Sequence, residues 1–240
     1  MIRSDRTLSV KRHEDKYLIP LERAKELQKR LALLCREDSH NTGTNGYKIR
    51  SLYFDDPKNG DFEDKLAGIA KRKKIRLRIY DEKSETVKLE VKEKQGDLQR
   101  KISCFISKEE AQQLIRGNLS ALSTRFPDSK EAISIYLHIN SGGQSRPVVL
   151  IEYDRLAYTL PCNETRITID KNVRCAEYYY DLFASSPPYR YVLAEYAVLE
   201  VKYNGCLVSP VADLLSHYHL TQCAVSKYCL GRPLYYDYLY

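Results

Sequence analysis

KIRLRIY (residues 74–80) and VKLEVKEK (residues 87–94) decide how this chain folds. Apolar and charged residues alternate in both segments, and a strand places alternate side chains on opposite faces of a sheet. The same alternation occurs at 47–54, 165–170 and 198–203, and less regularly at 10–19. A more apolar segment at 147–158 carries Glu152 and Arg155. The sequence therefore predicts about eight β-strands, most with one apolar and one charged face.

The charged faces carry an excess of cations. Six of them hold eleven Lys or Arg and four Asp or Glu: Arg12, Glu14, Lys16, Lys48, Arg50, Arg76, Arg78, Lys88, Glu90, Lys92, Lys94, Arg166, Asp170, Glu200 and Lys202. One such strand, taken alone, indicates a half-buried antiparallel sheet with its polar side in water. Solvated faces usually mix both signs of charge with Ser, Thr and Gln, whereas here Lys and Arg recur on strand after strand. A surface of this kind favours a polyanionic ligand.

Amphipathic helices are predicted between the strands. The first follows Pro20, with Leu21, Ala24, Leu27, Leu31 and Leu34 on one face. Others are expected from Ser107, with Glu110 completing a capping box, at 129–139, from Ser209 as N-cap, and as a short turn from Ser226 to Gly231. Helices outside and charges inside predict an α+β fold with a closed antiparallel barrel, wide enough for one small ligand.

The bulk composition fits one soluble domain over residues 1–240. The chain is 43% hydrophobic and 30% charged, with a net charge of +7. No apolar run is long enough to span a membrane, and the first residues lack the apolar core of a secretory signal. Seven cysteines without metal-ligand spacing indicate reduced thiols. We therefore expect a cytoplasmic protein that does not itself span a membrane. A partner protein in a membrane stays open as an alternative.

Eight short motifs, in order along the chain, resemble the vacuolar transporter chaperone (VTC) polyphosphate polymerase domain, of the triphosphate tunnel metalloenzyme superfamily. They are RHEDKY (12–17), SLYFD (51–55), IRLRIY (75–80), LEVK (89–92), YDR (153–155), RITID (166–170), LEVK (199–202) and SKY (226–228). Each is weak alone, but together they cover nearly the whole chain. Proteins of this kind in eukaryotes also carry regulatory and membrane-spanning regions, and we expect this chain to correspond to the bare catalytic domain.

The resemblance implies a role for each matching residue. Phosphate would be held by Lys16, Arg76, Arg78, Lys92, Arg155, Arg166 and Lys202, with Lys227 reaching in from the C-terminal helical turn. Arg76, Arg78, Lys92 and Lys227 would act in catalysis. Glu200 would hold Mn²⁺ or Mg²⁺, and Glu14 and Glu90 occupy positions where related phosphatases place metal-binding carboxylates. Arg155 has the apolar parity of its strand, so we expect a β-bulge to turn it inward.

The implied activity is synthesis of inorganic polyphosphate from the γ-phosphate of ATP. Phosphoryl transfer needs positioning and charge stabilisation, which Arg, Lys and a divalent ion supply. Three alternatives stay open: a triphosphatase or polyphosphatase of the same superfamily, a non-catalytic binder of polyphosphate or nucleotide, and a nucleic-acid-binding β-protein. The last would need exposed aromatic residues interleaved with basic ones on an open face, whereas the aromatic residues here lie mainly on the apolar parity or in the termini. We therefore expect no nucleic-acid partner.

Three further motifs are expected to carry no chemistry. His217 and His219 lie two apart on the predicted fourth helix, where they would diverge. The basic run at 71–74 is interpreted as a solvated turn before a strand. The tyrosine-rich end at 235–240 is assigned no function.

Overall fold

The computed structural model of the chain describes residues 12–96 and 98–232, and these fall into two compact units. Unit 1 comprises residues 1–47, 154–171 and 193–225, and unit 2 comprises residues 48–153, 172–192 and 226–240. Two long strands, β7 (Arg146–Leu160) and β8 (Thr165–Glu177), contribute residues to both units. The tyrosine-rich end and the first eleven residues lie outside the described part.

Unit 1 is an antiparallel group of strands backed by helices. Strand β10 (Tyr196–Asn204) pairs with both β1 (Arg12–Pro20) and β8, and the short β2 (Arg36–Glu37) pairs with β7. Helices α1 (Leu21–Leu34) and α6 (Ser209–Ser216) complete the unit with two short 3₁₀ turns, η1 (Gly43–Asn45) and η2 (Cys162–Glu164). Apolar residues of α1 and α6 and one parity of the strands form a core that includes Leu27, Ile167, Leu199 and Leu215.

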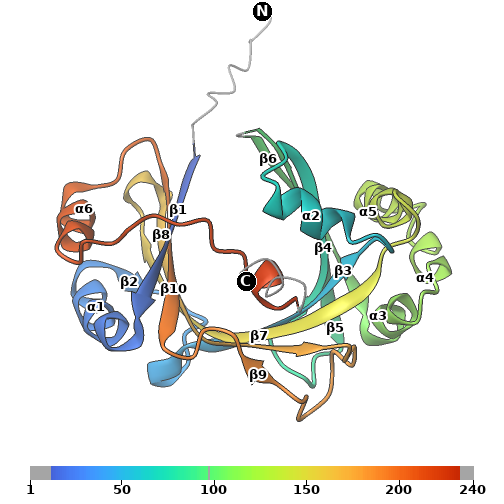
Figure 1. The fold of residues 1–240 in the computed structure, drawn as a ribbon, viewed down its shortest axis with the longest axis horizontal. Helices are drawn as coiled ribbons and strands as arrows, with labels where there is room; N and C mark the ends of the chain where they lie inside the picture. The colour runs from blue at the N-terminus through green and yellow to red at the C-terminus, as the bar shows by residue number, and fades with distance from the viewer. Residues whose placement is uncertain (1–11, 97, 233–240) are drawn as a thin grey trace, which may run out of the picture. The chain divides into compact units, whose positions relative to one another are not determined.

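Unit 2 holds a second antiparallel group of strands. They are β3 (Tyr47–Asp55), β4 (Lys71–Ile79), β5 (Thr86–Gln95) and β6 (Leu98–Ser107), in the order β7-β3-β4-β5-β6, with β9 (Arg190–Tyr191) paired to β8. The helices are α2 (Gly60–Leu66), α3 (Lys108–Ile115), α4 (Ser120–Ser123), α5 (Lys130–Asn140) and α7 (Lys227–Leu230). In Figure 1, α3, α4 and α5 lie on one side of the unit 2 strands and the short red α7 on the other.

Most predicted helices are confirmed, because their end signals act as expected. Ser107 and Glu110 form the capping box of α3, and Ser129 and Ser226 accept backbone N–H groups at the starts of α5 and α7. Two details are wrong. The N-cap of α6 is Val208 and makes no side-chain cap hydrogen bond, and Leu34 is exposed at the end of α1.

Several strand predictions need correction. The basic run at 71–74 is the first part of β4, because each of its residues is paired with a residue of β5. Strand β6 and helices α2 and α4 are absent from the prediction. His217 and His219 lie just beyond α6, as its C-cap and in the following turn, so they are not on the helix.

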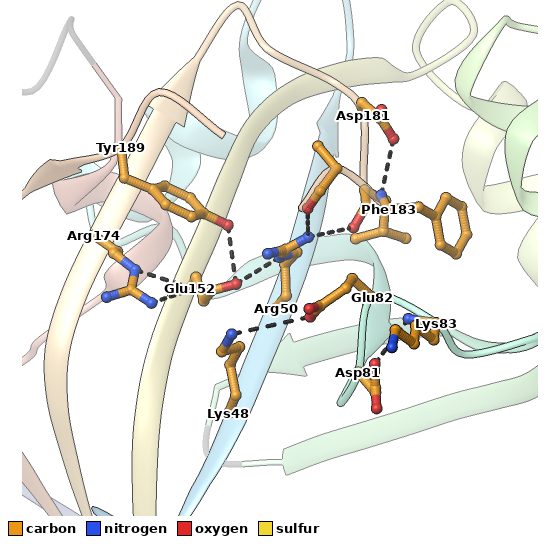
Figure 2. A network of polar contacts seen from close by, with 12 residues as sticks. Lys48, Arg50, Asp81, Glu82, Lys83, Glu152, Arg174, Asp181, Phe183 and Tyr189 are labelled. Atoms are coloured by element: carbon orange, nitrogen blue, oxygen red, sulfur yellow. Dashed lines mark hydrogen bonds and ion pairs between the residues drawn. The ribbon is translucent and has the colours of Figure 1, made fainter. Parts of the chain in front are cut away.

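Lys48 and Arg50 do not belong to the polar face assigned to them. Arg50 has the parity of Leu52 and Phe54, which are core residues. Figure 2 shows its buried guanidinium between Glu152 and the backbone of the 182–184 segment: Nε donates to Glu152 at 2.6 Å, and Nη1 donates to the carbonyls of Leu182 and Ala184. Lys48 has the same parity and approaches Glu82 at 4.0 Å.

Glu152 is the centre of this network. It also binds Arg174 and accepts a hydrogen bond from the hydroxyl of Tyr189 at 3.1 Å (Figure 2). Burial opposes the charge on Glu152, but the hydrogen bonds from Arg174 and Arg50 outweigh it and lower the pKa of the carboxyl. We infer a structural role, since every charge here is paired within the protein.

The architecture is therefore an antiparallel sheet with helices, in the α+β class as expected. β1 is the outermost strand of unit 1 and β6 that of unit 2. No helix among the described residues is long and apolar enough to cross a membrane. All seven cysteines are free thiols, as the sequence predicts.

Candidate functional site

The register of the unit 2 strands places polar side chains, together with the exposed Phe105, in four rows on the face opposite α3, α4 and α5. We call these rows the unit 2 polar face: Ser51, Arg78, Lys88 and Phe105; Tyr53, Arg76, Glu90 and Ser103; Lys74, Lys92 and Lys101; Arg72, Lys94 and Gln99. The alternate residues of the same strands, such as Ile75, Leu77 and Val91, are buried in the core. On β4, β5 and β6 this face carries eight cations and one carboxylate.

The one carboxylate, Glu90, is buried and holds three cations. Its Oε2 accepts Nε of Arg76 at 2.8 Å, and its Oε1 lies 2.5 Å from Nζ of Lys101 and 3.8 Å from Nζ of Lys88. Burial alone would raise the pKa of Glu90, but Arg76, Arg78 and Lys101 lower it to about 2. Glu90 therefore stays ionised at neutral pH and fixes the guanidinium of Arg76.

Tyr53 responds to the surplus positive charge. It is buried, which raises the pKa of a phenol, yet Arg76, Arg78 and Lys74 outweigh burial and lower its pKa to about 8. Nη1 of Arg76 donates to its hydroxyl at 3.2 Å. A phenol that loses its proton this readily indicates an environment that favours anions.

Arg78 and Lys227 meet at a second tyrosine. Arg78 donates Nε to Ser51 at 3.2 Å and Nη2 to the hydroxyl of Tyr153 at 3.4 Å. Nζ of Lys227, on α7, lies 4.7 Å from the centroid of the Tyr153 ring. The structure thus brings three predicted catalytic residues, Arg76, Arg78 and Lys227, to the same face of unit 2. Lys92, the fourth, is in the adjoining row.

That adjoining row sets like charges side by side. Lys92 of β5 lies directly opposite Lys74 of β4 and Lys101 of β6. Like charges facing each other across strands destabilise a sheet. The row is therefore a concentrated set of cations, in which Lys101 also pairs with Glu90 and Lys74 donates to Ser226 at 2.8 Å.

Unit 1 gathers a second, charge-balanced set of predicted residues, the unit 1 cluster: Glu14, Lys16, Glu200 and Lys202. Nζ of Lys16 lies 2.9 Å from Glu14 and 3.3 Å from Glu200, and Nζ of Lys202 lies 2.6 Å from Glu200 and 3.8 Å from Glu14. Burial disfavours the charge on Lys16, but the two carboxylates outweigh burial and raise its pKa.

The two arginines predicted in unit 1 are also paired. Nη1 of Arg166 donates to Asp38 at 2.6 Å. Burial opposes the charge on Asp38, yet its hydrogen bonds to His40 and Arg166 lower its pKa to about 2. Arg155 donates Nε and Nη2 to the two oxygens of Asp170, at 2.6 and 2.8 Å.

The expectation that Arg155 needs a β-bulge is wrong. Leu156 of β7 lies in the core beneath α1, so the opposite parity, which includes Arg155, already faces away from the helices. Its partner Asp170 has the parity of Thr168, which lies directly opposite Glu200. The residues of β7 that share the parity of Arg155 therefore lie on the polar side of the sheet, although most of them are apolar.

The carboxylates of the unit 1 cluster fit a divalent metal ion. Glu14 and Glu200 converge on the same ammonium groups, so their oxygens already surround a cation, and carboxylate oxygen is the donor that Mg²⁺ and Mn²⁺ prefer. Among the described residues no three His, Cys, Asp or Glu are grouped so as to hold a metal ion by themselves. The remaining ligands would have to come from phosphate or water.

Sequence reasoning missed several residues of the unit 2 polar face. The sequence places Lys48 and Arg50 on the charged parity of residues 47–54 and so leaves Tyr53 on the apolar parity, and Lys101 lies on a strand that is not predicted. Both could have been found from the sequence, because SLYFD puts Tyr53 in the parity of Ser51 and Gly96 is a turn residue directly after the alternating segment at 87–94. In the structure Gly96 has a positive φ of 58° and follows the end of β5. A hairpin there would have placed Lys101 opposite Lys92.

Comparison with solved structures finds similar folds, among them the following two. A candidate adenylate cyclase from Bacillus halodurans is 13% identical, with a TM-score of 0.51, over 90% of this chain and 95% of that one. A candidate adenylyl cyclase from Hippeastrum, described as having a dominant triphosphatase activity, is 14% identical, with a TM-score of 0.53, over 91% and 93% of the two chains. At these identities the likeness concerns the fold alone. No curated protein matches the sequence.

A family model gives the assignment. The model described as the VTC domain matches residues 11–236, which include every residue named in the unit 2 polar face and in the unit 1 cluster. The resemblance found in the sequence motifs is confirmed, and this chain belongs to the VTC domain family.

Proposed function

We propose that this protein is a metal-dependent phosphotransferase that builds inorganic polyphosphate from the γ-phosphate of ATP. One observation carries the proposal: β4, β5 and β6 present eight cations and one carboxylate on a single face, in a chain that belongs to the VTC domain family. A phosphate chain neutralises such a surface with charge-assisted hydrogen bonds.

In unit 2, Arg76 and Arg78 hold the transferring phosphate. Arg76 is oriented by Glu90 and Arg78 by Ser51, so each guanidinium fork is fixed before the ligand arrives. Fixed donors cost little reorganisation and stabilise the charge that develops on the non-bridging oxygens. Lys92 and Lys227 contribute further point charges, and these four are the proposed catalytic residues.

In unit 1, Lys16, Lys202, Arg155 and Arg166 bind further phosphates, and Glu200 and Glu14 hold the metal. A divalent ion, when bound, shields the charge of phosphate oxygens. Glu90, in unit 2, stays a predicted metal ligand, although each ion-pair partner given for it among the described residues is a cation. Polyphosphate as acceptor has an ionised terminal oxygen, so the reaction needs no general base.

The single domain, the closed tunnel and the cytoplasmic location are parts of the same proposal. The family model spans both units, which supports treating residues 1–240 as one functional domain. The closed barrel is proposed from the VTC family assignment.

The second candidate is a triphosphatase that uses water as acceptor. The carboxylate Glu14 beside Glu200 favours it, since an additional acidic group is available to orient water, and the Hippeastrum neighbour is described with such an activity. A non-catalytic binder of polyphosphate or nucleotide is a third. ATP, triphosphate and polyphosphate are the proposed ligands in all three cases.

The products of one incubation separate these functions. Purified protein is mixed with ATP and either Mn²⁺ or Mg²⁺, and polyphosphate, ADP and free phosphate are resolved on a gel. We expect ADP together with a ladder of polyphosphate in the wild type. The ladder should be absent in Arg76→Ala and retained in Arg30→Ala, which removes an arginine of α1 outside both sites. ADP and free phosphate without a ladder would support the triphosphatase, and no turnover would support a binding protein.

A further inference from the structure

Helix α7 is fastened to the strands of unit 2 by a buried hydrogen bond. The hydroxyl of Tyr228 donates to Oδ2 of Asp55, and both residues are almost fully buried. Asp55, at the end of β3, also accepts the backbone N–H groups of Asp56, Asp61 and Phe62, at 2.8, 2.9 and 3.1 Å. Buried carboxylates need such donors. Tyr228 therefore ties α7 to the junction of β3 and α2.

Packing around Tyr228 supports the same placement. Its ring stacks on Tyr53 with the centroids 5.2 Å apart, and the edge of Phe62 meets it at 6.2 Å. The guanidinium of Arg232 lies 5.8 Å from the Tyr228 ring. Behind the helix, a Cβ added to Gly231 would come within 2.9 Å of Ile151, so the end of α7 lies directly against β7.

These contacts decide where Lys227 points. A helix of a single turn has little stability of its own, so its position comes from the contacts it makes. Ser226 caps α7 and accepts Nζ of Lys74 at 2.8 Å, while Lys227 lies over the ring of Tyr153, whose hydroxyl accepts from Arg78. Tyr228, the next residue, projects instead toward Asp55.

We infer that Asp55 and Tyr228 are positioning residues for Lys227. Their hydrogen bond fixes α7 so that the ammonium of Lys227 meets the same phosphate as Arg78. The identity of that anion rests on the proposed function, but the fastening of α7 does not. Neither Asp55 nor Tyr228 contributes a charge to the unit 2 polar face, so they act on phosphate through Lys227.

A double-mutant cycle tests the inference with tripolyphosphate as the probe, measured by titration calorimetry. We expect Lys227→Ala to weaken binding by about tenfold and Tyr228→Phe by about threefold to tenfold. The double variant should bind no more weakly than Lys227→Ala alone, because Tyr228 acts only through Lys227. Tyr158→Phe is the control, since its buried hydroxyl makes no hydrogen bond to any described residue. Normal binding by Tyr228→Phe, or losses that add in the double variant, would overturn the inference.

The buried thiol of Cys229 gives a second, independent measurement. This residue of α7 is 3% exposed, so its alkylation by iodoacetamide, followed on its peptide by mass spectrometry, reports undocking of the helix. Tyr228→Phe and Asp55→Asn should alkylate faster at Cys229 than the wild type, and tripolyphosphate should slow the wild-type reaction. Unchanged rates in folded variants would contradict the fastening. If both variants fail to fold, a wild-type rate that tripolyphosphate leaves unchanged contradicts the link to Lys227. If the wild type binds no tripolyphosphate but the variants are alkylated faster than the wild type, the proposed function is overturned and the fastening of α7 stands.

Discussion

At the scale of single residues, Tyr53 reports the charge of the unit 2 polar face. Its pKa of about 8 results from Arg76, Arg78 and Lys74 outweighing burial. We expect a spectrophotometric titration at 295 nm to show a phase near pH 8 that is absent in Tyr53→Phe. Tripolyphosphate should move this phase to higher pH, because a bound anion offsets the cations. Tyr80→Phe, which removes an exposed phenol, is the control. A phase unaffected by tripolyphosphate would place the anion elsewhere.

Asp61 makes the stability of the fold depend on pH. Burial, the first cause, raises its pKa from 3.8 to about 7 despite Lys73 at 3.7 Å. The folded state therefore binds this proton more tightly than the unfolded state does. The stabilising contribution of protonated Asp61 to the free energy of unfolding is fully present below about pH 4 and is lost as the pH rises through about 7.

Asp61→Asn should remove this dependence. At pH 8 we expect its free energy of unfolding to exceed that of the wild type by about 2–4 kcal/mol, with a smaller difference at pH 5. Urea unfolding at several pH values measures it, with the exposed Asp213→Asn as control. A variant less stable than the wild type at pH 8 would show that Asp61 is stabilised as a carboxylate.

Glu200 separates catalysis from binding. In the structure it pairs with Lys16 and Lys202, which agrees with the alternative that it is only an ion-pair partner. If it also holds the metal, Glu200→Gln should still bind tripolyphosphate, while its turnover falls by orders of magnitude. Excess Mn²⁺ is expected to restore part of the activity. Turnover close to that of wild type at low metal concentration would leave only the ion-pair role.

At the scale of secondary-structure elements, the row of three lysines places like charges side by side on β4, β5 and β6. Lys92→Gln should raise the stability of the ligand-free protein by about 0.2–1 kcal/mol, because it removes repulsion from both Lys74 and Lys101. The gain should shrink in high salt, which screens the charges. Thermal unfolding at two salt concentrations measures it, with Lys29→Gln on α1 as control. A loss of stability in low salt would show that Lys92 is held by attractive contacts instead.

The strands also show what could be predicted from sequence. Ile75, Leu77 and Val91 were assigned correctly to the core because their strands have one apolar and one polar face. In β3 both faces are buried, so the polarity of Arg50 and Tyr53 indicated the wrong sides. The register with β4 shows which face of the sheet Tyr53 occupies, because it places Tyr53 opposite Arg76.

At the scale of the whole molecule, the net charge of +7 is not spread evenly over the predicted site residues. Those of unit 1 are paired with carboxylates, whereas the unit 2 polar face has a large surplus of cations. Sequence could predict which residues are charged and on which strands. It could not predict this division, because the pairing of Arg166 with Asp38 spans 128 residues.

The most direct measurement is tripolyphosphate binding by wild type, Arg76→Ala and Arg78→Ala, each compared by calorimetry with Arg30→Ala. We expect each of the first two variants to lose about 1.5–3 kcal/mol of binding free energy per lost hydrogen bond, because these bonds are charge-assisted. Arg30→Ala should bind like the wild type. Unchanged affinity in both Arg76→Ala and Arg78→Ala would contradict the claim that the unit 2 polar face binds phosphate.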